Sequence, residues 1–199
     1  IQLLKKWGLK FKIHPSRIKE VSNCKRPSAI VKDLALQKAE NVRRAFKNSV
    51  IISADTIVVL GGKIIGKPKN CGHSDEILKK LNGSIHKVYT GVAILSPEKS
   101  IVFDAAKVKM KKLGKEKLKT LAGKHMDKAG AYAVQDKNDN FVEKICGDYF
   151  TVVGLPYVKL RKELKRFSIK DFLIFILIRD VIGKIFAGDV IFVQFRNKN

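Results

Sequence analysis

The segment 50–68 constrains the fold of this chain more than any other. An apolar run at 50–52 leads into Ser-Ala-Asp-Thr at 53–56, and a β-branched run follows before the glycine pair at 61–62. Runs of β-branched residues that end at adjacent glycines are typical of strands joined by a tight turn. The pattern therefore predicts a strand, an acidic break, a second strand and a hairpin turn.

Asp55 and Lys67 give this hairpin a candidate chemical role. An aspartate at the end of a buried strand is poorly placed for packing, but well placed to hold a metal ion or accept a proton. A lysine beyond the hairpin can return to the same cleft and neutralise a phosphate. For either residue alone, a turn aspartate or a solvated lysine would be the favoured interpretation. Their joint occurrence favours the functional interpretation.

Lys38 lies on the apolar stripe of a helix predicted from about 28 to 46, with Ser28 as its N-cap. It follows Leu34 by one helical turn and precedes Val42 by another, so the three share a face. A buried cation needs a partner, which a phosphate in a cleft could provide. The alternative is that Lys38 lies at the edge of the stripe and extends its ammonium group into water. The two interpretations are evenly balanced.

The remaining pattern predicts alternating strands and helices, with some adjacent strands, which favours an α/β fold with a mixed sheet. His86, inside one strand, is interpreted as a hydrogen-bonded structural residue rather than a metal ligand. Beyond 167, a helix at 168–185 and a strand at 190–195 are predicted. The other predicted strands cover 11–18, 85–95, 100–110, 132–135 and 141–145, and the other predicted helices cover 1–9, 74–81 with Ser74 as N-cap, 114–121 and 156–167.

Composition narrows the class of protein. The apolar fraction of 45% in 199 residues is enough for one domain with a core. A formal charge of +23 predicts attraction to polyanions, but the lysines are scattered and no RNA-binding aromatic motif or zinc finger accompanies them, so no stable nucleic-acid partner is expected.

Three separated cysteines favour a reducing, cytoplasmic setting. The longest apolar run, 172–178, is far shorter than the roughly 20 residues of a membrane span, so no membrane partner is expected.

Several separated motifs occur in an order that resembles a known family. They are Ser-Ala-Asp-Thr at 53–56 with Gly-Lys-Pro at 66–68, His-Lys-Val-Tyr-Thr-Gly-Val at 86–92, Asp-Lys-Ala-Gly-Ala-Tyr-Ala-Val-Gln at 127–135 and Gly-Asp-Tyr-Phe-Thr-Val-Val-Gly-Leu-Pro at 147–156. In this register they closely resemble the Maf family of nucleoside triphosphate pyrophosphatases. The resemblance covers about 1–167, a Maf-like domain, and leaves 168–199 as an extension of unknown role. It implies a mixed α/β sheet in an elongated fold with two lobes and a central cleft, and often a homodimer.

The resemblance also implies an activity. Such proteins hydrolyse a nucleoside triphosphate, an acid anhydride, to the monophosphate and pyrophosphate, with a divalent cation such as Mg²⁺ or Mn²⁺. The roles that the resemblance implies are proton acceptor for Asp55, metal ligand for Glu20 and Asp55, phosphate binding for Lys38 and Lys67, and base specificity for Thr56 and Gln135.

Within the family, this chain resembles the branch that acts on dTTP and UTP rather than on methylated GTP. The resemblance rests on Thr56, on Gln135 and on the Val-x-Gly-Leu-Pro ending at 152–156. A glutamine amide offers a donor and an acceptor, which match the O–NH–O edge of thymine or uracil. The expected substrates are therefore dTTP and UTP, with modified nucleotides as further candidates.

The chain departs from the family pattern at its amino-terminal side. The pattern opens with a strand and a phosphate-cradling Ser-x-Ser-Pro-Arg-Arg loop, whereas this sequence opens at Ile1, past the place of that loop. Either the sequence is a fragment or the protein lacks this strand, which would leave an unpaired sheet position and put activity in doubt. Two other classes stay open: an inactive Maf-like nucleotide-binding protein and a basic nucleic-acid-binding protein. Pyrophosphate release separates the first, and a steep salt dependence of nucleic-acid affinity would mark the second.

Overall fold

The computed structural model describes residues 10–194 except 17, 48, 97 and 167–188. Its regular elements alternate between strands and helices. The strands are β1 (Lys10–Pro15), β2 (Val50–Leu60), β3 (Lys63–Ile65), β4 (Ile85–Leu95), β5 (Lys99–Met110), β6 (Val142–Cys146) and β7 (Asp189–Gln194), and the helices are α2 (Pro27–Arg43), α3 (Cys71–Leu81), α4 (Lys115–Leu121), α5 (Tyr149–Val153) and α6 (Tyr157–Arg166).

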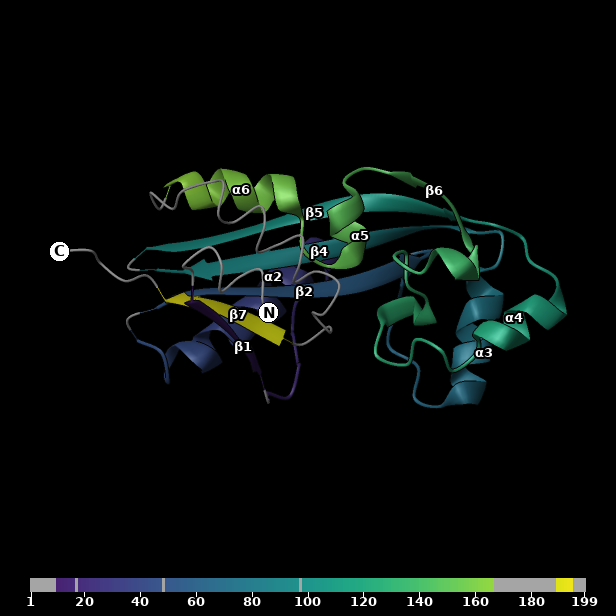
Figure 1. Ribbon diagram of the computed structural model, residues 1–199, viewed down its shortest axis with the longest axis horizontal. Helices are drawn as coiled ribbons and strands as arrows, with labels where there is room; N and C mark the ends of the chain where they lie inside the picture. The colour runs from purple at the N-terminus through teal and green to yellow at the C-terminus, as the bar shows by residue number, and fades with distance from the viewer. Residues whose placement is uncertain (1–9, 17, 48, 97, 167–188, 195–199) are drawn as a thin grey trace.

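One sheet forms the long axis of an elongated molecule. Its strand order is β1-β7-β2-β4-β5-β6, with β3 paired to β2 off this path. The strands β2, β4 and β5 run along the length, while β1, β7 and α6 lie at one end and α3 and α4 at the other (Figure 1). The predicted α/β class is therefore confirmed.

All pairs between described strands are antiparallel, whereas a mixed sheet was predicted. The cause is topological. The strands β1 and β2, joined through α2, run in the same direction, but β7 lies between them and pairs antiparallel with both. The strand β7 thus occupies the sheet position between β1 and the start of β2.

The predicted hairpin at 50–68 is present, with one difference. Asp55 does not end a strand, because β2 continues through it and pairs Asp55 with Gly91 of β4. The side chain of Asp55 finds a cationic partner, described below, so the strand tolerates a buried acid. Gly61 and Gly62 then adopt φ of +54° and +78°, values that favour glycine, and the chain turns back into β3.

Two helices begin earlier than predicted. Proline suits the first helical position because that position needs no N–H donor, so α2 begins at Pro27 and Ser28 lies inside the helix. The side chain of Asn70 accepts a hydrogen bond from the His73 N–H at 2.8 Å and caps α3. Ser74, the predicted N-cap, lies inside α3 and accepts a hydrogen bond from the Gly123 N–H at 3.0 Å. None of the described helices has the length and hydropathy needed to cross a membrane.

The segment predicted as a strand at 132–135 is irregular. A 3₁₀ turn at Ala129–Ala131 precedes it, and Gly130 and Ala131 take φ of +81° and +56°, which no strand permits.

The short helix α5 was not predicted, because five residues carry no helical period. The strands at 85–95 and 100–110 and the helices at 114–121 and 156–167 agree with β4, β5, α4 and α6 to within one residue at each end. The predicted helices at 1–9 and 168–185 lie outside the described residues.

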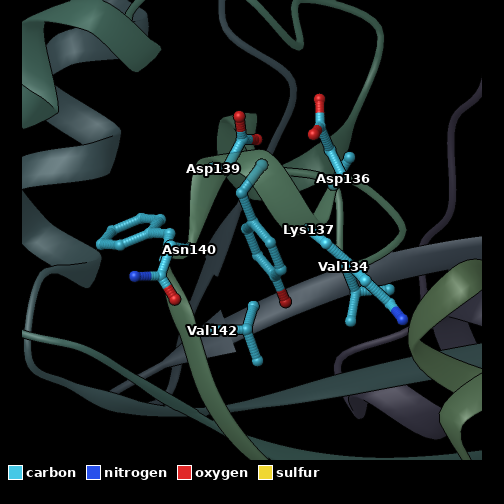
Figure 2. Close-up of a pocket in the computed structure, with 9 residues that line it drawn as sticks. Val134, Asp136, Lys137, Asp139, Asn140 and Val142 are labelled. Carbon is cyan, nitrogen blue, oxygen red and sulfur yellow. The ribbon is translucent and has the colours of Figure 1, made fainter.

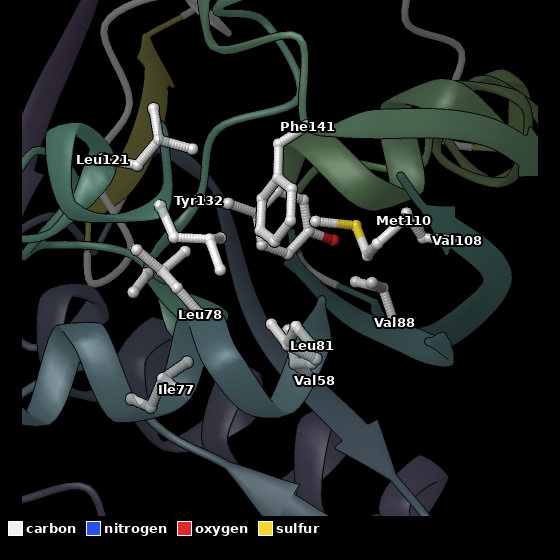
Figure 3. Packing of buried hydrophobic residues seen from close by; sticks show 12 residues of the cluster. Val58, Ile77, Leu78, Leu81, Val88, Val108, Met110, Leu121, Tyr132 and Phe141 are labelled. Carbon is white, nitrogen blue, oxygen red and sulfur yellow. The ribbon is translucent and has the colours of Figure 1, made fainter. Parts of the chain in front are cut away.

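Separate apolar clusters hold the two ends of the molecule. A small cluster between α2 and the sheet contains Ala35, Val42 and Ile51. A larger one, the distal core, packs α3 and α4 on β4 and β5, and Figure 3 shows Leu78 and Leu81 facing it. Its twelve members are Val58, Ile77, Leu78, Leu81, Val88, Val108, Met110, Leu118, Leu121, Ala131, Tyr132 and Phe141.

Gly91 sets how closely α2 approaches the sheet. A Cβ atom added there would lie 2.3 Å from the carbonyl oxygen of Val31, a separation that no side chain can adopt. Because Gly91 is the cross-strand partner of Asp55, the same close approach brings α2 down beside that carboxylate. The glycine thereby positions the helix that carries Lys38.

Candidate active site

The centre of the site is an ionic cluster of Lys38, Asp55 and Glu20. The Lys38 ammonium group donates a hydrogen bond to Asp55 Oδ1 and lies 3.1 Å from Glu20 Oε1. The Lys38 side chain is fully buried, that of Asp55 is 6% exposed and that of Glu20 is 38% exposed. A cation below α2 is therefore held by one buried and one accessible carboxylate.

This geometry decides between the two interpretations of Lys38. A residue with no exposed surface does not extend into water, so the interpretation of Lys38 as a solvated edge residue is wrong. The requirement for a partner is confirmed, and in this structure the partners are carboxylates. The partner suggested from the sequence was a phosphate, because the helix pattern alone does not reveal which strand lies below it.

Burial dominates the acidity of Asp55. Loss of solvent raises the pKa of its carboxyl group above the usual 3.8, and the nearby charge of Glu20 raises it further. The charge and hydrogen bond of Lys38 and the charge of Lys67 act in the opposite direction without cancelling the effect. Asp55 is thus a stronger base than a solvated aspartate.

Lys67 belongs to the same electrostatic environment. It follows β3, is exposed, and its charge acts on the Asp55 carboxyl group. The loop that carries it is tied to the 3₁₀ turn, since the Gly130 N–H donates to the Gly66 carbonyl at 3.2 Å. The structure thus places Glu20, Lys38 and Asp55 in direct contact, with Lys67 close enough for its charge to act on Asp55.

The edge of β2 beside Asp55 has no strand partner among the described residues. On this edge β7 pairs with 50–53 and β3 pairs with 58–60, which leaves 54–57 between them. Asp55 and Thr56 both lie in the interval. A ligand at this edge can therefore reach side chains on either face of the sheet.

Thr56 projects from the face opposite to Asp55, because successive strand residues alternate. Its hydroxyl lies 2.9 Å from that of Thr90, on β4, and its Oγ1 lies next to Gly154 at the end of α5. Gln135 is exposed and makes no hydrogen bond with any described residue. Within the described residues, neither of the two residues expected to set base specificity is hydrogen-bonded to the ionic cluster.

Gln135 instead follows a segment, 132–134, that lines a cavity away from the ionic cluster. This cavity has a volume of about 250 Å³, and Figure 2 shows Val134, Asn140 and Val142 around it. Asp55 and Lys38 do not line it. Its lining residues are Tyr132, Ala133, Val134, Asp136, Lys137, Asp139, Asn140, Phe141 and Val142.

His86 and Tyr132 anchor this segment to β4. The Nε2 atom of His86 lies 2.8 Å from the Tyr132 hydroxyl, and the imidazole is 2% exposed. Burial lowers the pKa of His86 to about 4, so the ring is neutral near pH 7. The predicted structural role of His86 is confirmed.

A second ionic cluster was not predicted. Lys124 lies 2.7 Å from Asp136 and 2.5 Å from Asp139, and His125 Nε2 lies 2.6 Å from Asp139. His125, Asp136 and Asp139 present ligand atoms within 4.8 Å of one another, so they could hold a metal ion. The spacing of the two aspartates was visible in the sequence, but nothing in it linked them to residues 124–125.

The fold and the ionic cluster define an α/β protein with a buried lysine–carboxylate cluster at an interrupted edge of its central strand. The sequence pattern of a family described as "Maf-like protein" matches residues 1–167. A dTTP/UTP pyrophosphatase from Elusimicrobium minutum is 44% identical over 171 residues, covering 84% of this chain and 93% of the relative. Proteins with the same name from Dictyoglomus turgidum and Aquifex aeolicus are 43% and 42% identical, covering 84% of this chain and 91% and 90% of those relatives. The chain belongs to the Maf family.

Proposed function

We propose that this protein is a nucleoside triphosphate pyrophosphatase that hydrolyses dTTP and UTP to the monophosphate and pyrophosphate. The observation that carries the proposal is the convergence of Asp55, Lys38 and Glu20 at the open edge of β2. The names of the relatives support the nucleotide class. Modified nucleotides are further candidate substrates.

In the proposed reaction, Asp55 accepts a proton from water as the oxygen attacks the α-phosphorus. The bond from this phosphorus to the oxygen bridging the α- and β-phosphates breaks, and pyrophosphate leaves with the bonding electrons. A base with a raised pKa suits this role, because proton transfer is most efficient when the pKa approaches the working pH. Lys38 and Lys67 would neutralise phosphate oxygens.

We propose Glu20 and Asp55 as ligands of Mg²⁺ or Mn²⁺. Each carboxylate gives one oxygen to the Lys38 ammonium group, which leaves Glu20 Oε2 and Asp55 Oδ2 as the hard oxygen ligands that suit these ions. When bound, the ion would polarise phosphate oxygens. Excess EDTA should abolish pyrophosphate release and added Mg²⁺ should restore it, while Glu20→Gln should raise the Mg²⁺ concentration needed. Full activity in EDTA would contradict the proposal.

Thr56 and Gln135 are proposed to read the base. Their separation from the ionic cluster is compatible with a nucleotide that places its phosphates near Asp55 and its base elsewhere. A homodimer and a cytoplasmic location complete the proposal, and the three cysteines, all exposed and unpaired, support a reducing setting. Sedimentation of the purified protein tests the dimer.

The deciding experiment measures pyrophosphate release from a panel of nucleoside triphosphates. The proposal expects dTTP and UTP to exceed ATP, GTP and 7-methyl-GTP. A protein that binds nucleotides without cleaving any of them would instead be a nucleotide-binding member of the family. A faster reaction with 7-methyl-GTP than with dTTP would overturn the base assignment and leave the reaction type standing.

A further inference from the structure

A chain of side-chain hydrogen bonds leads away from Thr56 through the sheet. Thr56 Oγ1 lies 2.9 Å from Thr90 Oγ1, and Thr90 Oγ1 donates to the main-chain carbonyl of Thr151 at 2.7 Å. The Thr151 hydroxyl donates in turn to Asp104 Oδ2 at 2.7 Å. Thr90 and Thr151 are fully buried, whereas Thr56 is partly exposed at the open edge of β2. The chain therefore connects a buried carbonyl to the hydroxyl of a partly exposed residue at the open edge of β2.

The Thr151 carbonyl determines which hydroxyl donates in each hydrogen bond between Thr56, Thr90 and Thr151. A carbonyl oxygen only accepts, so the single proton of the Thr90 hydroxyl is committed to Thr151. In the contact between Thr56 and Thr90, the donor must then be Thr56. With its own proton committed to Thr90, Thr56 can only accept hydrogen bonds from a ligand.

The Thr151 carbonyl holds this arrangement in place. It lies in the last turn of α5, where a carbonyl has no partner within the helix. Thr90 satisfies it. If Thr90 rotated away, a buried acceptor would lose its hydrogen bond, which disfavours the reversed state by roughly tenfold or more.

We propose that Thr90 is a positioning residue that locks Thr56 as an acceptor and so lets the site choose uracil or thymine over cytosine. The proposal rests on the proposed function. Uracil and thymine present an N–H donor at N3, which an acceptor-only hydroxyl binds. Cytosine presents a lone pair at N3, which the same hydroxyl repels. A threonine free to turn its hydroxyl could donate to cytosine and would discriminate less.

The test compares Thr90→Val with Thr90→Ser and uses Thr151→Val as the matched control. Thr90→Val removes the donor to the carbonyl and frees the Thr56 hydroxyl, whereas Thr90→Ser retains both bonds. Thr151→Val removes a buried hydroxyl of the same chain but keeps the carbonyl, so Thr90 remains oriented. The readout is the ratio of kcat/KM for UTP to that for CTP, with N3-methyl-UTP as a substrate that lacks the N–H.

The wild-type protein should prefer UTP to both CTP and N3-methyl-UTP by about tenfold or more. Thr90→Val should lower the UTP/CTP ratio about tenfold, and Thr90→Ser and Thr151→Val should preserve it. A wild-type protein that does not discriminate, or a Thr90→Val variant that loses both activities equally, would overturn the inference.

A chain that releases no pyrophosphate from any nucleotide would refute the proposed function separately. In that case, the affinities of the wild-type protein and of the three variants for α,β-methylene UTP and CTP decide the inference. A wild-type preference for the UTP analogue that falls only in Thr90→Val supports it, and equal affinities reject it.

Discussion

Two ionic clusters in this molecule have the same arrangement and opposite electrostatic behaviour. In the inner cluster Lys38 lies between Asp55 and Glu20, and in the outer cluster Lys124 lies between Asp136 and Asp139. The Lys38 side chain has no exposed surface, whereas that of Lys124 is 41% exposed. The two clusters therefore differ mainly in how far the central lysine is exposed to water.

The pKa values of Asp55 and Asp136 shift in opposite directions. The pKa of Asp55 is raised because its burial outweighs the attraction of Lys38. The pKa of Asp136 is lowered because the hydrogen bond from Lys124 outweighs its desolvation. A neighbouring lysine therefore does not by itself keep an aspartate ionised. The inner cluster is suited to proton transfer, and the outer cluster to fixing the loop that follows Gln135.

The largest contrast is expected between Asp55→Asn and Asp139→Asn. Loss of the proposed base should lower kcat at least about 10²-fold, while the protein still folds. Asp139→Asn removes a carboxylate of the outer cluster and should leave kcat within a few-fold of the wild-type value. Pyrophosphate release under saturating dTTP measures both. Near-normal turnover of Asp55→Asn would remove Asp55 from its proposed role.

The second largest difference between the clusters is expected when the central lysine of each, Lys38 or Lys124, is replaced by methionine. Lys38→Met leaves Asp55 buried without its cation, a change that costs about 3–5 kcal/mol when one partner of a buried pair is removed. The pKa of Asp55 should rise further, so the acid limb of the kcat/KM profile should move to higher pH. Lys124→Met, at an exposed position, should leave this limb in place. Urea denaturation and a pH–rate profile measure the two effects, and an unshifted limb in Lys38→Met would contradict the coupling.

Gln135→Glu tests whether the loop of the outer cluster reads the base. The substitution replaces an amide that both donates and accepts by a carboxylate that only accepts. In the proposed complex, this carboxylate would face the carbonyl oxygens of thymine or uracil. The value of kcat/KM for dTTP should fall about tenfold or more, with little change in stability. Lys137→Met, two residues away and also exposed, serves as the control. Equal losses in the two variants would favour a general effect of the loop.

The smallest expected effect is on the pH dependence of stability. The folded-state pKa of Asp55 is raised, so its contribution to the free energy of unfolding is present below 3.8 and is lost as the pH rises through the folded-state pKa. The pKa of Asp136 is lowered, so its contribution is present above 3.8 and is lost as the pH falls. Relative to the wild type, Asp55→Asn should gain stability and Asp136→Asn should lose it as the pH rises from 3 to about 6. Slopes of the same sign would refute the comparison.

The sequence predicted the inner cluster better than the outer one. The hairpin around Asp55 and the apolar stripe with Lys38 are local patterns, and each identified a residue that needed a partner. The pairing itself depends on the close contact of α2 with Gly91, which no local pattern reveals. The outer cluster joins residues 124–125 to residues 136–139 across a segment of irregular backbone, so hydrophobic periodicity gave no signal for it.

Three further features that the sequence did not predict also depend on contacts between distant parts of the chain. The sequence pattern places Asp55 at a strand end because an isolated buried acid is unfavourable, whereas the structure supplies its counter-charge from Lys38 on α2. The place of β7 between β1 and β2 depends on pairing between residues far apart in the chain. The hydroxyl chain from Thr56 to Asp104 joins four elements, and the sequence positions of Thr90 and Thr151 gave no reason to connect them.

The position of β7 has a consequence for synthesis in the cell. One edge of β2 stays unpaired until residues 189–194 are synthesised, and these leave the ribosome after all the other described strands. At about 5–20 residues per second, the delay between the emergence of β2 and of β7 is on the order of ten seconds. During this interval the nascent chain exposes a strand edge that can pair with other chains. Yield of folded protein should therefore depend on translation speed and on chaperones that shield β2 until β7 emerges.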